Sequence, residues 1–188
     1  MVRVIIPDRT VKITNSEKAG EYLKGIGVIY ERWGTRVIDP ENSGSDQILE
    51  SYKEEIEQLK KEGSYTTADV IDINEKTPGL EAMLEKFRAE HTHNEDEVRF
   101  TISGRGIFHI HPEGGDVVAI EVEGGDLIRV PRGTKHWFDL CEDRHIRAIR
   151  LFQDISGWTP YYTNSGKDRN YEPICLGPSY IKPGNVRK

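Results

Sequence analysis

The chain has 188 residues, of which 36% are hydrophobic and 31% charged, and its formal net charge is −6. That length is sufficient for one domain with a sizeable core. The acidic balance, with no cluster of basic residues, argues against a nucleic-acid partner, and no apolar run is long enough to span a membrane. The apolar run at the N-terminus is broken by Arg3 and Pro7, which indicates a strand rather than a signal peptide.

Alternating apolar residues in the first half of the chain predict short strands. These segments are residues 2–6, 10–13, 26–38 and 66–73, the third being a pair of strands around Trp33 and Gly34. Two other segments have helical spacing, namely residues 45–62, ended by Gly63, and a helix that starts at Pro78 and ends near Glu90. Their apolar stripes are Ile48, Tyr52, Ile56 and Leu59 in the first, and Leu80, Met83, Leu84 and Phe87 in the second. We expect both stripes to be buried, the first against a sheet.

From residue 98 onward, short apolar segments alternate with glycine-containing turns, which is typical of a β-sandwich or a small barrel. The predicted strands are residues 98–102, 107–110, 117–122, 127–130 and 148–152. Residues 153–188 are rich in Gly, Pro, Asn and Tyr, so we expect an irregular segment that wraps the barrel or covers its mouth. The two cysteines, Cys141 and Cys175, have no metal-binding spacing; a reduced cytosol suits them, and Cys141 is expected to be a small buried residue.

The most informative stretch is residues 91–99. If it is an extended strand, then His91, His93, Glu97 and Arg99 all project from one face, because side chains alternate along a strand. Such a polar face is unsuited to an apolar core. It suits a metal site, in which the two imidazoles and the carboxylate bind the ion and the arginine attracts an anionic substrate. The simpler alternative is a solvated face of a charged strand.

A lone histidine downstream weakens that alternative. His136 follows an apolar strand and a Pro-x-Gly turn, and an antiparallel pairing of strands can bring it opposite the first two histidines. Three histidines and Glu97 would leave two adjacent positions open on an octahedral metal, enough for a bidentate substrate. His109 and His111 form a rival His-x-His pair, but no glutamate follows at the right distance, and we expect them to be wall or edge residues of a barrel.

Both stretches carry a family resemblance. The pattern H-x-H-x3-E-x6-G is present as His91, His93, Glu97 and Gly104, and G-x5-P-x-G-x2-H as Gly125, Pro131, Gly133 and His136. Together they resemble the two motifs of the cupin superfamily. Two positions depart from the pattern: Glu85 stands where the first motif has its leading glycine, and Leu140 where the second often ends in asparagine. Neither is a metal ligand.

The wider context resembles the acireductone dioxygenase family within the cupins. The matching segments are residues 87–100, 130–139, 148–152 and 157–158, in the same order over nearly the whole chain. The resemblance implies a mainly β, cupin-type barrel (a double-stranded β-helix or jelly roll) with a few peripheral helices. We expect one domain over residues 1–188, with the metal-binding barrel core at about 65–152.

The resemblance also implies the ligands and the reaction. His91, His93, Glu97 and His136 would bind one Fe(II) or Ni(II) per chain. The substrate would be the enediol 1,2-dihydroxy-3-keto-5-(methylthio)pentene of methionine salvage, cleaved with O2. Iron would give 4-methylthio-2-oxobutanoate and formate, and nickel would give methylthiopropionate, formate and carbon monoxide. We expect a cytoplasmic monomer with no nucleic-acid or membrane partner.

Two arginines and three aromatic residues complete the expected site. Arg99 and Arg150 would stabilise substrate or intermediate anions, although a salt bridge is an alternative role for Arg150. Phe87, Phe138 and Trp158 would line the pocket, with ordinary core packing as the alternative. Two other functions remain open: a metal-dependent isomerase on the same site, which would consume no O2, and a cupin that binds a ligand without catalysis.

Overall fold

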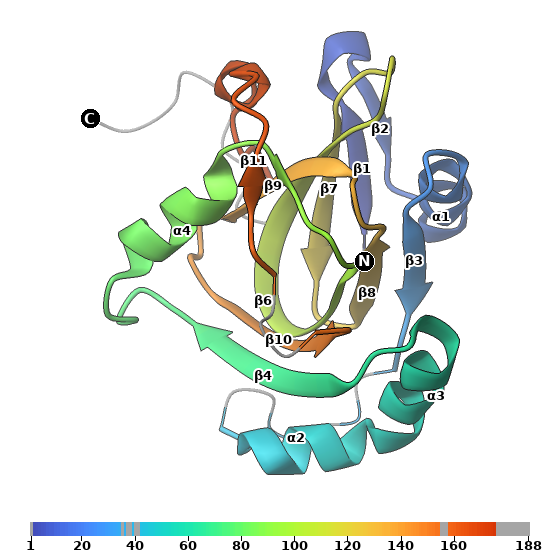
Figure 1. Cartoon of the computed structure of the whole chain (residues 1–188), viewed down its shortest axis with the longest axis vertical. Coiled ribbons are helices and arrows are strands. Elements are labelled where there is room, and N and C mark those ends of the chain that lie inside the picture. The colour runs from blue at the N-terminus through green and yellow to red at the C-terminus, as the bar shows by residue number, and fades with distance from the viewer. Residues whose placement is uncertain (1, 35, 37–38, 40–41, 155–157, 176–188) are drawn as a thin grey trace.

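Two antiparallel sheets that share one long strand, β6 (Glu97–His111), form the body of the molecule (Figure 1). The computed structural model describes residues 2–34, 36, 39, 42–154 and 158–175. The first sheet has the order β11-β5-β9-β6-β7-β1-β2, and the second is built as β3-β8-β6-β10-β4. The predicted mainly β barrel is confirmed.

The other strands are short. In the first sheet they are β1 (Arg3–Ile6), β2 (Val11–Ile13), β5 (His91–Thr92), β7 (Val118–Glu123), β9 (Lys135–Leu140) and β11 (Tyr161–Tyr162). In the second they are β3 (Ile29–Arg32), β4 (Thr67–Ile73), β8 (Asp126–Val130) and β10 (Ile146–Phe152). Strands β1 and β3 pair with β7 and β8, so the N-terminal segment is hydrogen-bonded to the barrel.

The N-terminal segment differs from the prediction in one helix. After β1, the turn η1 (Pro7–Arg9) and β2, residues that were given no structure form α1 (Ser16–Gly25). Asn15 caps it by accepting a hydrogen bond from the Lys18 amide at 3.0 Å. Only Ala19 and Leu23 of this helix are buried, and two residues are too few to reveal a helical period. Residues 37 and 38, expected in the partner strand of β3, lie outside the described residues.

The predicted helix at residues 45–62 is two helices, α2 (Ser45–Ser51) and α3 (Lys53–Gly63). Tyr52 lies between them with φ −115° and ψ 19°, which interrupts the helical backbone. The expected apolar stripe is nonetheless buried against the outer face of the second sheet, where Phe100 and Leu127 belong to the same cluster. The second predicted helix is confirmed as α4 (Leu80–Arg88), on the side of the barrel that Figure 1 shows at the left.

Strand β6 was expected to be two strands separated by a turn at Gly104, and this expectation is wrong. Its pairing with β10 shifts register instead, since Arg147 pairs with Ser103 whereas Ala148 pairs with Thr101. The additional residue in β6 is a β-bulge, and a shift of one residue exchanges the two faces of a strand. Gly104 has φ +74°, and a Cβ there would lie 2.1 Å from a backbone oxygen, so glycine is required.

The bulge decides which side chains of β6 point into the barrel. Before it, Arg99 points inward, while Phe100 packs on the outer face. After it, Phe108 is in the interior cluster and its ring centroid lies 5.2 Å from the Arg99 guanidinium carbon. Ile107 lies in the cluster on the opposite face. One strand thereby presents odd-numbered residues inward at one end and even-numbered residues inward at the other.

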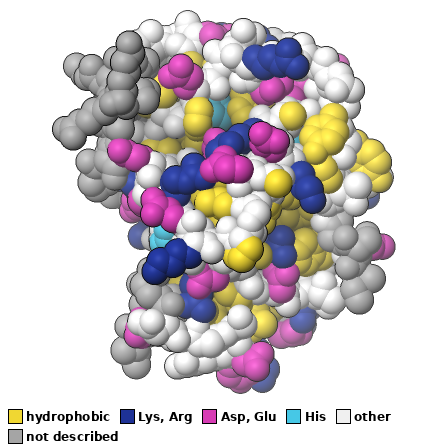
Figure 2. Space-filling model, turned by 90° about the vertical axis from the view of Figure 1, so that its left-hand side faces the viewer, with side chains coloured by type: hydrophobic (Ala, Val, Ile, Leu, Met, Phe, Trp, Pro, Cys, Tyr) yellow, Lys and Arg dark blue, Asp and Glu magenta, His cyan; other side chains and the backbone are white. Residues whose placement is uncertain are grey.

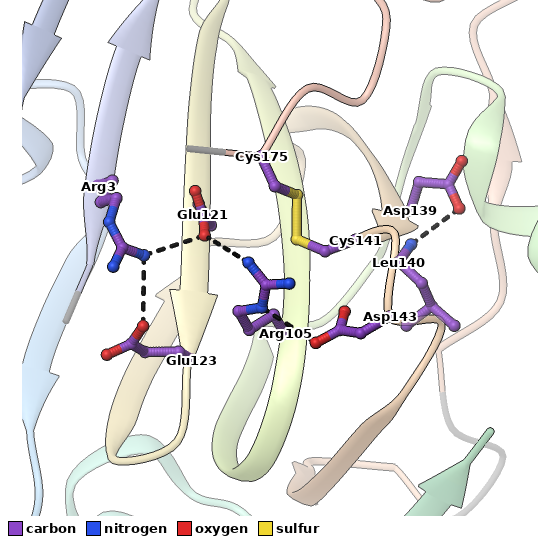
Figure 3. The surroundings of a disulfide bond; sticks show 9 residues. All are labelled: Arg3, Arg105, Glu121, Glu123, Asp139, Leu140, Cys141, Asp143 and Cys175. Atoms are coloured by element: carbon purple, nitrogen blue, oxygen red, sulfur yellow. Dashed lines mark hydrogen bonds and ion pairs between the residues drawn. A yellow bond between two sulfur atoms is a disulfide. The ribbon is translucent and has the colours of Figure 1, made fainter. Parts of the chain in front are cut away.

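The cysteines form a disulfide, which corrects the expectation of reduced thiols. Cys141 directly follows β9 and Cys175 lies in the C-terminal segment, with their Cα atoms 5.8 Å apart (Figure 3). The prediction for Cys141 as a small buried residue holds, since it is 1% exposed. Apart from β11 and the turn η2 (Lys167–Asn170), the described part of residues 153–175 is irregular, as expected.

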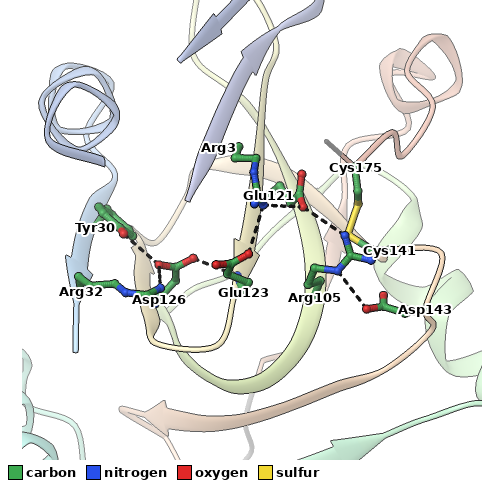
Figure 4. A network of polar contacts seen from close by, with 10 residues as sticks. All are labelled: Arg3, Tyr30, Arg32, Arg105, Glu121, Glu123, Asp126, Cys141, Asp143 and Cys175. Carbon is green, nitrogen blue, oxygen red and sulfur yellow. Dashed lines mark hydrogen bonds and ion pairs between the residues drawn. A yellow bond between two sulfur atoms is a disulfide. The ribbon is translucent and has the colours of Figure 1, made fainter. Parts of the chain in front are cut away.

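Buried ion pairs tie the N-terminal strand to the outer face of the first sheet (Figure 4). Glu121 is fully buried, and its Oε1 atom forms ion pairs with Nη1 of Arg3 at 2.9 Å and with Nη1 of Arg105 at 3.5 Å. Arg105 also reaches Asp143, next to the disulfide. A carboxylate buried at this depth is tolerable only when cations accompany it, so the network fixes β1 against β7.

The exposed surface agrees with the composition. On the face shown in Figure 2, basic and acidic side chains are interspersed instead of being grouped by sign. In the part of the chain that the structure covers, no helix has the length and hydropathy needed to cross a membrane.

Candidate metal centre

Three histidines meet inside the barrel. His91 on β5 pairs directly with His136 on the antiparallel strand β9, and His93 follows β5. One ring nitrogen from each lies within 4.8 Å of the other two, and all three residues are at least 98% buried. The antiparallel pairing expected from the sequence therefore brings His136 to the first two histidines. The uninterrupted strand over residues 91–99 is wrong, because the chain bends between β5 and β6.

The backbone fixes the orientation of each imidazole. The Nδ1 atoms of His91, His93 and His136 lie 2.7, 2.8 and 2.8 Å from the carbonyl oxygens of Ala89, Thr159 and Thr134. A carbonyl can only accept, so each Nδ1 carries the proton and donates. The Nε2 atom of each ring is then left with a lone pair, the tautomer that binds a metal.

Glu97 completes the cluster. Its Oε2 atom lies 3.2 Å from Nε2 of both His93 and His136, and its Oε1 atom accepts a hydrogen bond of 2.9 Å from Arg99. Burial alone would raise the pKa of the Glu97 carboxyl. Arg99, followed by the two histidines, outweighs burial and holds that pKa well below its usual range, so the group is ionised.

These four side chains fit a divalent metal ion. The Nε2 atoms of His91 and His93 are buried without a hydrogen-bond partner. Nε2 of His93 does lie close to Glu97, but this contact does not have the geometry of a hydrogen bond. Buried polar atoms are normally satisfied, and unsatisfied ones that converge need an explanation. Burial lowers the pKa of His91 to about 4, which keeps it neutral and able to ligate. Contact with Glu97 instead outweighs burial at His93 and raises its pKa.

The two predicted arginines lie side by side beside the cluster. Arg99 on β6 pairs with Arg150 on β10, and both guanidinium carbons lie 5.5 Å from the ring centroid of Trp158. Arg99 is 5% exposed and its Nε atom has no hydrogen-bond partner. Arg150 instead forms a bidentate pair with Asp69, at 2.9 and 2.6 Å. The salt bridge that the sequence left open for Arg150 is therefore present.

The three predicted aromatic residues border the same space. The Phe87 ring lies 5.9 Å from that of His91, and Trp158 stacks on His93 at 6.3 Å with an interplanar angle of 29°. Phe138 lies 4.4 Å from the Arg99 guanidinium carbon. Phe138 and Phe87 also pack in the interior cluster, and Trp158 packs on Phe152, so both of their expected roles, pocket wall and core, are consistent with the geometry.

The rival histidines lie elsewhere. His111 accompanies Glu90, with its Nδ1 atom 2.6 Å from the carboxylate, and His109 stacks on Trp137 on the outer face of the first sheet. The bulge in β6 explains the position of His109. It is odd-numbered like Glu97 and Arg99, but it lies beyond the bulge and therefore points outward.

Sequence reasoning missed the residues that hold the C-terminal segment over the centre. Strand β11 pairs with β5, and the carbonyl of Thr159 accepts the His93 hydrogen bond. Glu90, 2% exposed, accepts hydrogen bonds from Thr163 at 2.5 Å and Ser165 at 2.7 Å. The position of Glu90 next to His91 was a signal, but Thr163 and Ser165 are more than 70 residues away from it.

A cupin barrel with a buried cluster of three histidines and a carboxylate is the architecture of metal-dependent enzymes. Residues 7–160 match the model of the ARD/ARD' family. An acireductone dioxygenase of Picosynechococcus sp. is 39% identical over 164 residues, covering 87% of this chain and 93% of the relative. That of Pseudomonas aeruginosa is 40% identical over 158 residues, covering 84% and 87%. The chain belongs to the acireductone dioxygenase family of metal-dependent dioxygenases.

A solved structure agrees with this assignment. Acireductone dioxygenase from Bacillus anthracis, described with a cadmium ion in its active centre, superposes with a TM-score of 0.82 at 35% identity. The match covers 86% of this chain and 98% of that chain. The likeness extends over the whole barrel, so the fold expected from the sequence is confirmed.

Proposed function

We propose that the chain cleaves the acireductone 1,2-dihydroxy-3-keto-5-(methylthio)pentene with O2 in methionine salvage, using a metal held by His91, His93, Glu97 and His136. The observation that carries this proposal is the convergence of buried Nε2 atoms, each on a ring whose Nδ1 donates to a backbone carbonyl. The relatives are named for an acireductone, and the particular compound is the one that the family resemblance implies.

The donor set suits Fe(II) or Ni(II), with one ion per chain. Three nitrogens and one carboxylate oxygen are ligands of intermediate hardness, and no thiolate is present to select a softer ion. A divalent ion held by these residues would supply a Lewis acid for an enediolate substrate and would favour its reaction with O2. The neutral histidines and ionised Glu97 would give such a site a net charge of +1, which favours an anionic substrate.

Arg99 would bind the developing negative charge of the substrate. Its Nη2 donates to Glu97 and its buried Nε–H has no partner, so one guanidinium can orient the carboxylate and still donate to an anion. Arg150 would act more weakly, because Asp69 already neutralises it. Phe87, Phe138 and Trp158 would exclude water and accept the apolar methylthio end.

The domain organisation, the oligomeric state and the location of the chain are also proposals. A single domain over residues 1–188, with its barrel core at about 65–152, is supported by the pairing of β1 and β3 with barrel strands. A monomer that turns over a soluble metabolite in the cytoplasm fits the interspersed surface charge. The disulfide is uncommon in a reducing cytoplasm, so the thiol state in cells tests this location.

The test is aerobic turnover by apoprotein reloaded separately with Fe(II) and Ni(II), following O2 uptake and carbon monoxide release. We expect O2 uptake with both metals and carbon monoxide with nickel alone. Absence of O2 uptake with either metal, in protein shown to hold the ion, would overturn the proposal and favour a metal-dependent isomerase.

A further inference from the structure

A second hollow lies on the outer face of the first sheet, on the other side of β6 from the metal centre. Its floor is a row of side chains from neighbouring strands, paired in register. The row is Trp137, His109, Ala119, Ile5 and Lys12, on β9, β6, β7, β1 and β2. Ala119 has the smallest side chain of the row and stands in its middle. The resulting cavity is about 500 Å³ and is lined by the last four of these residues.

The C-terminal segment forms the facing wall. Asn170, Tyr171, Glu172 and Ile174 line the cavity from this side. Two bonds hold the wall in place: the Tyr171 hydroxyl donates to Asp8 at 2.6 Å, and the disulfide joins the next residue along, Cys175, to the end of β9 (Figure 3). The wall is thus bonded to the barrel on both sides of the cavity.

His109 is the unusual member of the lining. It is 1% exposed, and its Nδ1 atom is buried without a hydrogen-bond partner. Its ring stacks on Trp137 with centroids 4.9 Å apart and an interplanar angle of 6°, and the Tyr171 ring lies 6.4 Å away. Burial lowers the pKa of His109 to about 4, so it is neutral, with one ring nitrogen able to donate and the other to accept. The metal centre makes no use of this residue.

The size and chemistry of the cavity indicate its occupant. A volume of this order is typical of small-molecule sites, which combine apolar walls with a few polar groups. The rings of His109 and Tyr171 line one end, with Trp137 packed against both, and Ile5, Pro7, Ala119 and Ile174 supply the apolar part of the lining. The charged residues of the lining, Lys12 and Glu172, have opposite signs and balance. A neutral ligand is therefore favoured over an anion or a cation.

We propose that this cavity is a second small-molecule site, which takes a neutral, planar heteroaromatic ring that exchanges a hydrogen bond with His109. The ring would lie over Ala119 against the aromatic end of the row. The site does not depend on the metal or on the proposed reaction.

Indole is the probe, added to the metal-loaded full chain, with binding followed by NMR shifts and calorimetry. Ala119→Leu fills the floor, and we expect it to weaken indole binding at least tenfold. His109→Phe keeps a ring on Trp137 but removes the nitrogens, and we expect a loss of about threefold to tenfold. Ile29→Leu, an exposed change on β3, is the matched control and should leave binding unchanged.

The shifts should centre on Trp137 and leave Trp158 unaffected, and turnover by all three variants should stay within about twofold of the parent protein. Melting curves verify that the variants are folded. If Ala119→Leu is unstable, the indole affinity of His109→Phe alone tests the site. Three results would each overturn the proposal: no saturable binding of indole, the same indole affinity in folded Ala119→Leu and His109→Phe as in the parent protein, or shifts centred on the metal centre.

Discussion

Arg99 and Arg150 face each other across neighbouring strands and share one aromatic ring, that of Trp158, at 5.5 Å from each guanidinium carbon. Two adjacent cations repel each other, and a different carboxylate offsets the positive charge of each arginine. Glu97 pairs with Arg99 inside the barrel, whereas the half-exposed Asp69 pairs with Arg150. The two arginines therefore differ in how much charge they can offer a substrate.

This difference predicts unequal effects of removing each charge. Arg99→Met should lower kcat/KM by about 100-fold or more, because a buried, preorganised donor to a developing anion is lost. Arg150→Met should lower it only about tenfold, since Asp69 already screens that charge. Steady-state kinetics on both variants, with bound metal measured in parallel, gives the comparison. Near-normal activity of metal-loaded Arg99→Met would rule out the role given to Arg99.

Glu90 is predicted to hold the C-terminal segment over the metal centre. Burial would raise the pKa of its carboxyl, but the hydroxyls of Thr163 and Ser165 and then His111 outweigh burial and lower it. Glu90→Gln should reduce the free energy of unfolding by about 2 kcal/mol, because hydrogen bonds to a charged group are lost. Limited proteolysis should then cut within residues 158–165 sooner. Glu113→Gln, at an exposed carboxylate, is the control, and equal proteolysis of the two variants would contradict the assignment.

His109 predicts a pH dependence of stability that is independent of the metal. Its pKa in the folded protein is about 4, against an ordinary 6.5, so the unfolded chain binds the proton more readily. The stability linked to His109 is therefore complete above pH 6.5 and is lost as pH falls toward 4, by at most about 3 kcal/mol. Denaturant titrations of His109→Phe between pH 7 and 4 should give a flatter profile than the parent protein. Identical profiles would show that His109 is not buried neutral.

The disulfide predicts a stability that depends on reductant. It closes a loop with a sequence separation of 34 residues, and constraint of the unfolded chain by a loop of that length is worth about 3 to 4 kcal/mol. Cys175→Ser should melt at a lower temperature than the parent protein, and reductant should lower the melting temperature of the parent alone. Thiol titration of denatured, unreduced protein should find no free cysteine. Two free thiols per chain would contradict the pairing.

The meeting of the three histidines and the barrel could be predicted because their signals are local. The spacing of His91, His93 and Glu97 and the turn before His136 lie within short stretches of sequence. The alternation of apolar and polar residues along a strand is likewise visible within a few residues. The bulge in β6 could not be predicted, because it depends on pairing with Arg147 and Ala148, about 45 residues away. That bulge sends His109 outward, although its number has the same parity as that of Glu97.

The other omissions share this cause. The helix α1 buries only two residues, too few for a visible stripe. The two hydroxyl partners of Glu90 and the disulfide partner of Cys141 come from residues 163–175, a segment whose composition indicates only irregular structure. Long-range contacts of a segment without periodicity leave no pattern in the sequence. The family resemblance supplied the chemistry of the centre, but not the packing that holds it.

The most direct test of the central claim is the amount of metal retained per chain after loading with nickel and dialysis against a weak chelator. The parent protein is predicted to retain one ion. His136→Ala should lose most of it, while His111→Ala, which changes a histidine of the rival pair, should retain it. Retention by His136→Ala, or loss from a folded His111→Ala, would contradict the assignment of His91, His93, Glu97 and His136 as the metal centre.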